Sequence, residues 1–203
     1  MIGWVVLGIA GVALLRQILG LACLARYLRR AKVASIPKGE TPPISLLKPL
    51  YGEDPGVLAN LEATLRQNYP DFEVLFLHER QDDPAAAIAD EAMARVPHAA
   101  ARRILGRDPE AKNPKVAVVL RGEAVAKHGI VAVADSDMRP DPLYLRDIAN
   151  GLADADAVSF VPVVFGMGGL WARLGGLLFD TEAVLTVLLR RGNAMTGATV
   201  GIR

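Results

Sequence analysis

The chain has 203 residues, with 23 Lys and Arg against 22 Asp and Glu, so its formal charge is only +1. This near-balance argues against a nucleic-acid-binding protein, which would normally show a basic excess. Hydrophobic residues make up 52% of the chain, which is high for a purely soluble domain and favours a membrane segment. The single cysteine, Cys23, excludes an internal disulfide and a cysteine-based zinc site, and it fits a reducing compartment.

The N-terminal segment from Ile2 to Ala25 is mostly apolar and has about the length of a membrane-spanning helix. Arg16 interrupts it near the middle, at a cost that snorkelling of the side chain reduces. Basic residues follow at once: Arg26, Arg29, Arg30 and Lys32. The positive-inside rule then places the rest of the chain in the cytoplasm. We predict an uncleaved anchor with a basic flank at residues 1–32, with a cleaved signal peptide and an interfacial amphipathic helix as the alternatives.

A Pro- and Gly-containing linker is expected at residues 33–43, before a globular part at residues 44–203. In that part, short apolar runs alternate with helical patterns. Strands are predicted at 44–47, 72–77, 102–105, 130–134, 157–164 and 195–202. Helices are predicted at 55–67, 85–95, 116–127, 141–152 and 170–191, the first with Asp54 as its N-cap. This alternation predicts an α/β fold with a mostly parallel sheet, which binds ligands at the carboxyl ends of its strands.

Acidic residues follow two of these predicted strands. Asp82 and Asp83 come after the strand at 72–77, and Asp135 and Asp137 come directly after the strand at 130–134. Carboxylates one residue apart in a turn are able to direct oxygens at one hard cation, such as Mg²⁺ or Mn²⁺, with phosphate oxygens and water completing its shell. The alternative is that these are ordinary turn and cap residues.

Several short motifs, in order and at characteristic spacing, carry a resemblance to a known family. Over about residues 42–203 the chain resembles ceramide glucosyltransferases and their bacterial relatives, among them the hopanoid-biosynthesis-associated glycosyltransferase. These are inverting glycosyltransferases of the family 2/21 type, so the resemblance implies a GT-A-type, Rossmann-like sheet behind the N-terminal transmembrane helix. The motifs are KPLYGEDP at 48–55, NLE at 60–62, NYP at 68–70, FEVL at 72–75, DDPA at 82–85, NPKV at 113–116, DSD at 135–137 and TG at 196–197.

The resemblance implies nucleotide contacts at several of these motifs. Lys48 and Pro49 match the strand end that lines the nucleotide pocket. Asp82 and Asp83 match the aspartate region that contacts uracil and ribose. Lys115 matches a basic residue near the nucleotide, although a solvated helix lysine is an equally good interpretation.

The resemblance gives the Asp-Ser-Asp turn two tasks. Asp135 and Asp137 would hold Mg²⁺ or Mn²⁺, and Asp135 would also contact the diphosphate. The implied reaction moves a sugar from a UDP-sugar to a membrane lipid hydroxyl, of a hopanoid or a ceramide-like lipid, with the catalytic domain on the cytoplasmic side of a bacterial inner membrane. The alternatives are a processive polysaccharide synthase of the same fold and a non-catalytic nucleotide-sugar-binding membrane protein.

Two departures from the family pattern limit these expectations. Ala117 and Val118 stand where the family usually has Asn, which removes any amide contact to the donor from there. The family's general base and its Gln/Arg-X-X-Arg-Trp motif are expected beyond Arg203, so no catalytic base is assigned within the chain. Because inversion needs a base to take the acceptor proton, we expect residues 1–203 to bind a donor but to transfer sugar poorly.

The predicted helix at 170–191 has two possible roles. It is either a helix near the membrane surface that helps to admit a lipid acceptor, or a core helix that covers the sheet. Asp180 and Glu182 lie in its middle and fit lipid poorly, which favours the core helix.

Overall fold

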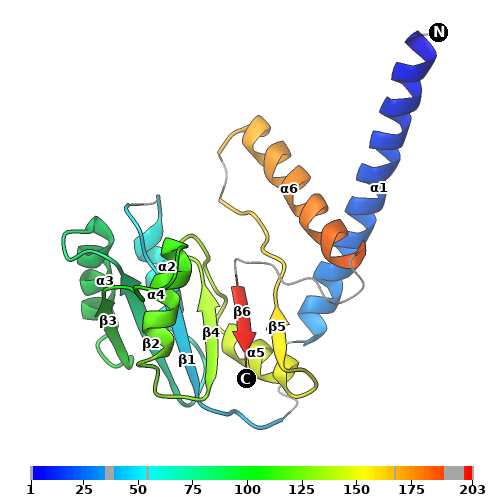
Figure 1. Ribbon diagram of the computed structural model, residues 1–203. Helices are drawn as coiled ribbons and strands as arrows, with labels where there is room; N and C mark the ends of the chain where they lie inside the picture. The colour runs from blue at the N-terminus through cyan, green and yellow to red at the C-terminus, as the bar shows by residue number, and fades with distance from the viewer. Residues whose placement is uncertain (1, 35–38, 54, 167, 190–198, 203) are drawn as a thin grey trace. The chain divides into compact units, whose positions relative to one another are not determined.

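The computed structural model describes all residues except 1, 35–38, 54, 167, 190–198 and 203 (Figure 1). The chain divides into two compact units. Met1–Ile36 and Val161–Thr196 form the helical unit, and Pro37–Phe160 and Gly197–Arg203 form the sheet unit. The domain limits predicted at 1–32, 33–43 and 44–203 remain predictions.

The sheet unit contains one six-stranded sheet in the order β3-β2-β1-β4-β6-β5. Its strands are β1 Ile44–Pro49, β2 Phe72–His78, β3 Ala101–Leu105, β4 Ile130–Ala134, β5 Ala157–Ser159 and β6 Thr199–Ile202. Strands β3, β2, β1 and β4 pair in parallel, whereas β6 is antiparallel to both of its neighbours. The predicted α/β fold with a mostly parallel sheet is therefore confirmed.

Helices cover both faces of this sheet (Figure 1). They are α2 Val57–Leu65, α3 Pro84–Arg95, α4 Pro114–Glu123 and α5 Tyr144–Leu152. Alternate residues of a strand point to opposite faces. Leu46 accordingly packs in the larger core with α2, α3 and α5, while its neighbour Leu47 packs with Val118 of α4. The central strands β1 and β2 are thus buried on both faces, as expected for strands in the middle of a parallel sheet.

Two helix boundaries differ from the prediction for reasons of capping. Helix α2 begins at Val57, not at residue 55, because Gly56 is its N-cap in the left-handed conformation at φ 79°. The predicted cap, Asp54, lies outside the described residues. Helix α4 begins two residues earlier than predicted, since the Asn113 side chain accepts hydrogen bonds from the first-turn amides and Pro114 takes the first helical position.

Two other boundaries were also predicted wrongly. Helix α5 begins at Tyr144, not at residue 141, and Asp141 instead accepts a hydrogen bond from Leu143 N at 2.7 Å. Strand β5 ends at Ser159, not at residue 164. Val161–Thr196 belongs to the helical unit, so this segment does not extend the strand.

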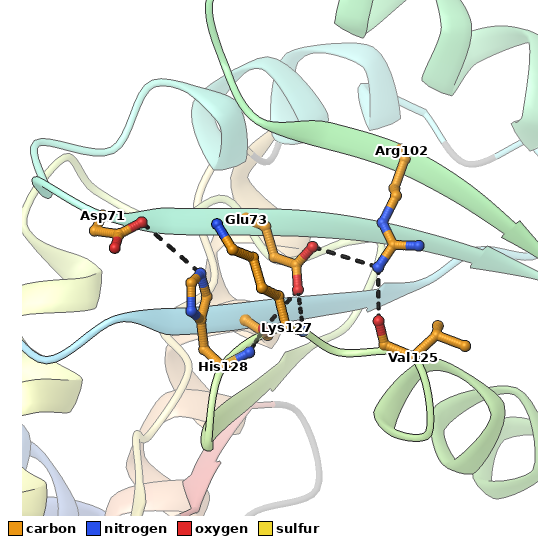
Figure 2. A network of polar contacts seen from close by, with 7 residues as sticks. Asp71, Glu73, Arg102, Val125, Lys127 and His128 are labelled. Carbon is orange, nitrogen blue, oxygen red and sulfur yellow. Dashed lines mark hydrogen bonds and ion pairs between the residues drawn. The ribbon is translucent and has the colours of Figure 1, made fainter.

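A polar network lies at the amino-terminal ends of β1, β2 and β3 (Figure 2). The Glu73 carboxylate of β2 accepts hydrogen bonds from Ser45 Oγ at 2.8 Å and from Lys127 N at 2.5 Å, and Arg102 lies 3.5 Å from it. Burial alone would raise the pKa of Glu73, but these hydrogen bonds and the Arg102 charge outweigh it and lower the pKa. The network joins β1, β2, β3 and the loop before β4 around one carboxylate.

The helical unit consists of α1 Ile2–Ala34 and α6 Leu170–Leu189, which pack against each other. Within α1, Gly3–Arg26 is the one described segment that is long and apolar enough to cross a membrane. Helix α6 belongs to this unit and packs against α1, and the interpretation of residues 170–191 as a helix covering the sheet remains a prediction. Hydrophobic patterning showed a helix with a buried side but not which partner buries it.

Candidate functional site

A pocket of about 700 Å³ opens at the carboxyl edge of the sheet, where ligands bind in parallel α/β folds. Its volume is in the range of small-molecule sites. Four segments meet there: the end of β1, the turn after β2, the first turn of α4 and the loop after β4. The lining residues are Pro49, Leu50, Tyr51, Glu79, Arg80, Pro114, Lys115, Val118, Asp135, Ser136 and Asp137.

The loop that carries Asp135 and Asp137 is held through its main chain. Lys48 is fully buried, and its Nζ donates to the carbonyl of Asp135 at 2.8 Å and to that of Met138 at 2.7 Å. Asn60 of α2 donates from Nδ2 to the carbonyl of Ser136 at 3.1 Å. The loop backbone is therefore fixed from two sides, and neither contact uses the carboxylates of the loop.

The buried amine of Lys48 has an unusual pKa. Burial lowers it from 10.5 to about 7, although the nearby charges of Asp137 and Asp135 oppose this change. The amine is thus only partly charged at neutral pH, where its hydrogen bonds to carbonyls compensate its removal from water. A direct contact between Lys48 and a nucleotide remains a prediction, and this geometry gives the amine a structural contact with the loop.

Lys115 and the two loop carboxylates form the charged part of the pocket. Lys115 Nζ lies 2.5 Å from Asp135 Oδ1, and the Asp137 side chain is exposed in the pocket wall. The pocket therefore brings together four of the predicted site residues, Pro49, Lys115, Asp135 and Asp137. The Lys115 side chain is 47% exposed beside its acidic partner, and its contact with a nucleotide remains a prediction.

The donor set at this loop suits a hard divalent cation that shares its shell with a ligand. Asp135 and Asp137 supply carboxylate oxygens, which Mg²⁺ and Mn²⁺ favour. Among the described residues, no group of three or more His, Cys, Asp or Glu side chains gathers around a common point. A metal held by two carboxylates needs other oxygens, and phosphate and water are the usual source. The residues thus fit a metal that binds together with a diphosphate.

Asp82 and Asp83 follow Arg80 in the chain, but they are not among the described residues that line the pocket. Asp83 Oδ1 accepts from Ala85 N at 2.9 Å as the N-cap of α3, and also from Gly52 N at 3.0 Å. The exposed Asp82 carboxylate pairs with Arg80 at 2.6 Å, and this hydrogen bond lowers the pKa of Asp82. Their predicted contacts to uracil and ribose remain predictions, with Arg80 as the group that reaches the pocket.

Other lining residues were not singled out from the sequence. Tyr51 is 85% exposed although it is a large aromatic residue, and Glu79 and Arg80 also line the pocket. The sequence did contain a signal for Tyr51. It follows a buried strand, as Asp135 does, and residues after parallel strands lie at the ligand-binding edge of the sheet. Val118, noted as a departure from the family pattern, forms an apolar part of the wall.

The sequence matches the description "Glycosyl transferase family 21" over residues 5–202, which is nearly the whole chain. The chain belongs to glycosyl transferase family 21. The predicted relationship to ceramide glucosyltransferases is thereby confirmed at the level of the family.

Curated relatives of this family 21 chain are described as ceramide glucosyltransferases. It is 27% identical over 151 residues to ceramide glucosyltransferase 1 of Caenorhabditis elegans, which covers 72% of the chain and 32% of that protein. It is 30% identical over 99 residues to the ceramide glucosyltransferase of Komagataella phaffii, which covers 47% of the chain and 19% of that protein. The chain therefore spans a third or less of the length of these two relatives.

Solved structures share the fold of this family 21 chain. A mannosyltransferase from Pyrobaculum calidifontis, PcManGT in complex with GDP-Man and Mn²⁺, superposes with a TM-score of 0.60 at 20% identity. The match covers 94% of the chain and 55% of the mannosyltransferase. It confirms the predicted GT-A-type fold.

Proposed function

We propose that this chain is the donor-binding part of an inverting glycosyltransferase that uses a UDP-sugar. The acceptor is the hydroxyl of a membrane lipid, either a hopanoid or a ceramide-like lipid. Membership of family 21 and the relatives named for ceramide, which is a lipid, support this assignment. The pocket at the carboxyl edge of the sheet supports the donor half of it.

The observation that carries the proposal is the position of Asp135, Asp137 and Lys115 in one pocket. A divalent cation and a diphosphate together present positive charge to carboxylates and negative charge to an ammonium group. The pocket offers both kinds of group within a few residues. Mg²⁺ or Mn²⁺ bound there would neutralise the charge that builds on the leaving diphosphate. The neighbouring mannosyltransferase contains this combination as GDP-Man and Mn²⁺.

In this proposal, the residues around the pocket have separate tasks in donor binding. Lys48 holds the loop backbone, so the two carboxylates keep their position when the donor enters. Lys115 exchanges its contact with Asp135 for a phosphate oxygen, which frees Asp135 to bind the metal with Asp137. Pro49 forms the wall at the end of β1.

The nucleoside end of the donor has its own set of residues in this proposal. Asp82 and Asp83 contact the uracil and ribose, as the family resemblance implies. Arg80 is the link between them and the pocket, because it lines the pocket and pairs with Asp82. The wall at Val118 offers only apolar contact, so donor selectivity in this chain does not use an amide there.

The proposal places the chain at a membrane through α1. Gly3–Arg26 has a mean hydropathy of 2.0. The segment ends at the basic residue Arg26, and Arg29 follows it. We propose that α1 crosses a bacterial inner membrane and that the sheet unit lies on the cytoplasmic side. A lipid acceptor is then available in the same membrane.

Calorimetric titration of the chain with UDP, with and without Mn²⁺, tests the donor half. We expect Asp137→Ala to weaken Mn²⁺-dependent UDP binding by at least about tenfold, which is ~1.4 kcal/mol. Asp154→Ala is the matched control, because Asp154 is exposed and outside the pocket lining. Unchanged Mn²⁺-dependent binding in Asp137→Ala, with the control also unchanged, would contradict the assigned role.

A further inference from the structure

Helix α6 exposes large apolar side chains beyond the side that it packs against α1. Trp171 is 83% exposed and Phe179 is 53% exposed. The full set, here named the α6 apolar surface, is Leu170, Trp171, Leu174, Leu177, Leu178 and Phe179. A helix in water normally buries its apolar stripe and shows polar residues elsewhere. A contiguous exposed apolar surface of this kind marks a binding partner.

The two acids of α6 both have partners within the helical unit. Asp180 is buried, and its Oδ1 accepts a hydrogen bond from Val164 N at 2.9 Å. The Glu182 carboxylate pairs with the Arg16 guanidinium and lies 3.4 Å from Gln17 Nε2. The acids therefore do not face outward with the apolar surface. Charges that are paired in this way are tolerated beside lipid, where isolated charges are not.

The contact between α6 and α1 lies within the candidate membrane span. Arg16, Gln17 and Gly20 are all part of Gly3–Arg26. Thr181 Oγ1 donates to Gln17 Oε1 at 3.0 Å, and a Cβ added at Gly20 would lie 2.9 Å from Thr181 Cβ. Close approach at glycine and hydrogen bonds between polar side chains are how helices associate in membranes. This contact places part of α6 beside the segment of α1 that would lie inside the membrane.

The direction of α6 takes its apolar surface along the span. Glu182 contacts Arg16, while Val184, two residues later, shares a cluster with Leu24. The two helices thus run in the same general sense, and the Leu170 end of α6 extends on the side of the N-terminal half of α1 (Figure 1). That half carries the apolar residues of the span and not its basic flank.

We infer that the α6 apolar surface contacts the acyl chains of a lipid bilayer, so that α6 is a second membrane-embedded element beside α1. The lipid is the occupant because the surface is continuous with the candidate span and carries no outward acid. This inference rests on the membrane anchoring by α1 that forms part of the proposed function. It does not depend on donor binding or sugar transfer.

The two tryptophans of the chain are natural reporters for the test, since Trp4 lies on α1 and Trp171 on α6. Trp4→Phe leaves Trp171 as the fluorophore, and Trp171→Phe leaves Trp4. Each variant of the full chain is reconstituted in vesicles of phosphatidylcholine and phosphatidylglycerol, with and without brominated acyl chains. Quenching by acrylamide from the aqueous phase is measured on the same samples.

We expect brominated lipid to remove most of the Trp171 emission and acrylamide to quench it weakly. If Trp4 is quenched by brominated lipid while Trp171 is quenched only by acrylamide, α1 is embedded and the inference about α6 is overturned. If brominated lipid quenches neither tryptophan, the anchoring in the proposed function fails and the inference fails with it. Donor binding, measured separately by calorimetry, stands or falls independently of these outcomes.

Discussion

Lys48 of β1 reaches under the loop after β4 and donates from Nζ to the main-chain carbonyl of Asp135 at 2.8 Å. The two residues are 87 positions apart in the chain, and parallel pairing of β1 with β4 brings them together. A core residue thus sets the position of the acidic loop. The loop carboxylates stay available for a ligand because the contact uses the backbone alone.

Replacement of Lys48 by Met should weaken donor binding without direct loss of a ligand contact. The substitution leaves the carbonyls of Asp135 and Met138 without their donor, so the loop loses its fixed position. We expect UDP and Mn²⁺ to bind about tenfold or more weakly, a cost of ~1.4 kcal/mol, when measured by calorimetry. Lys112→Met, at an exposed position, is the control and should bind as the wild type does. Equal affinity of Lys48→Met and the control would refute this role.

The lowered pKa of Lys48 predicts a pH dependence of stability. Between about pH 7 and pH 10.5 the unfolded chain binds a proton at Lys48 that the folded chain has released. The free energy of unfolding should therefore rise with pH in this window, by up to about 1.4 kcal/mol per pH unit. Urea unfolding in detergent at pH 7 and pH 9, followed by circular dichroism, measures the change. The rise should be smaller in Lys48→Met. An identical rise in both proteins would show that Lys48 does not cause the pH dependence.

The Glu73 network, at the other edge of the sheet, predicts a pH effect on stability in the acid range. Because its pKa is lowered on folding, Glu73 stabilises the fold above its ordinary pKa of 4.5, and this stabilisation is lost as the pH falls through the folded value. At pH 7, Glu73→Gln should lower the free energy of unfolding by about 1–3 kcal/mol. The variant should therefore unfold at a lower urea concentration than the wild type. It should also lose less stability than the wild type on acidification. Parallel acid profiles for the two proteins would show that Glu73 does not carry this effect.

Most strands were predictable because buried parallel strands are continuous apolar runs between turn residues, as at 72–77 and 130–134. The cap of α3 was also visible, since Pro84 follows Asp83. The role of Lys48 was not, because its partners come from a distant loop. Residues 170–191 showed a helix with an apolar pattern, but periodicity does not reveal whether a sheet, another helix or lipid covers it. The family motifs indicated Asp135 and Asp137, whereas Arg80 entered the site only through the fold.

Close packing at Gly20 gives a matched pair of variants in α1. Gly20→Leu should separate α6 from α1, because even a Cβ there would collide with Thr181, whereas a Cβ at Gly11 would meet nothing within 4 Å. Cys23 and Ala183 pack in the same cluster, so a short bifunctional thiol reagent should link Cys23 to a cysteine introduced by Ala183→Cys. We expect this cross-link to be lost with Gly20→Leu and kept with Gly11→Leu. Retention of the cross-link in both would argue against the close contact.

The central claim is that Asp135 and Asp137 hold a divalent metal together with a donor diphosphate. Electron–nuclear double resonance on the chain with Mn²⁺ and UDP tests it directly, because a ³¹P coupling appears only when phosphate oxygens are bound to the metal. We predict a ³¹P coupling from protein-bound Mn²⁺ in the wild type and its loss in Asp137→Ala. Protein-bound Mn²⁺ without a ³¹P coupling, or a coupling that survives in Asp137→Ala, would contradict the account.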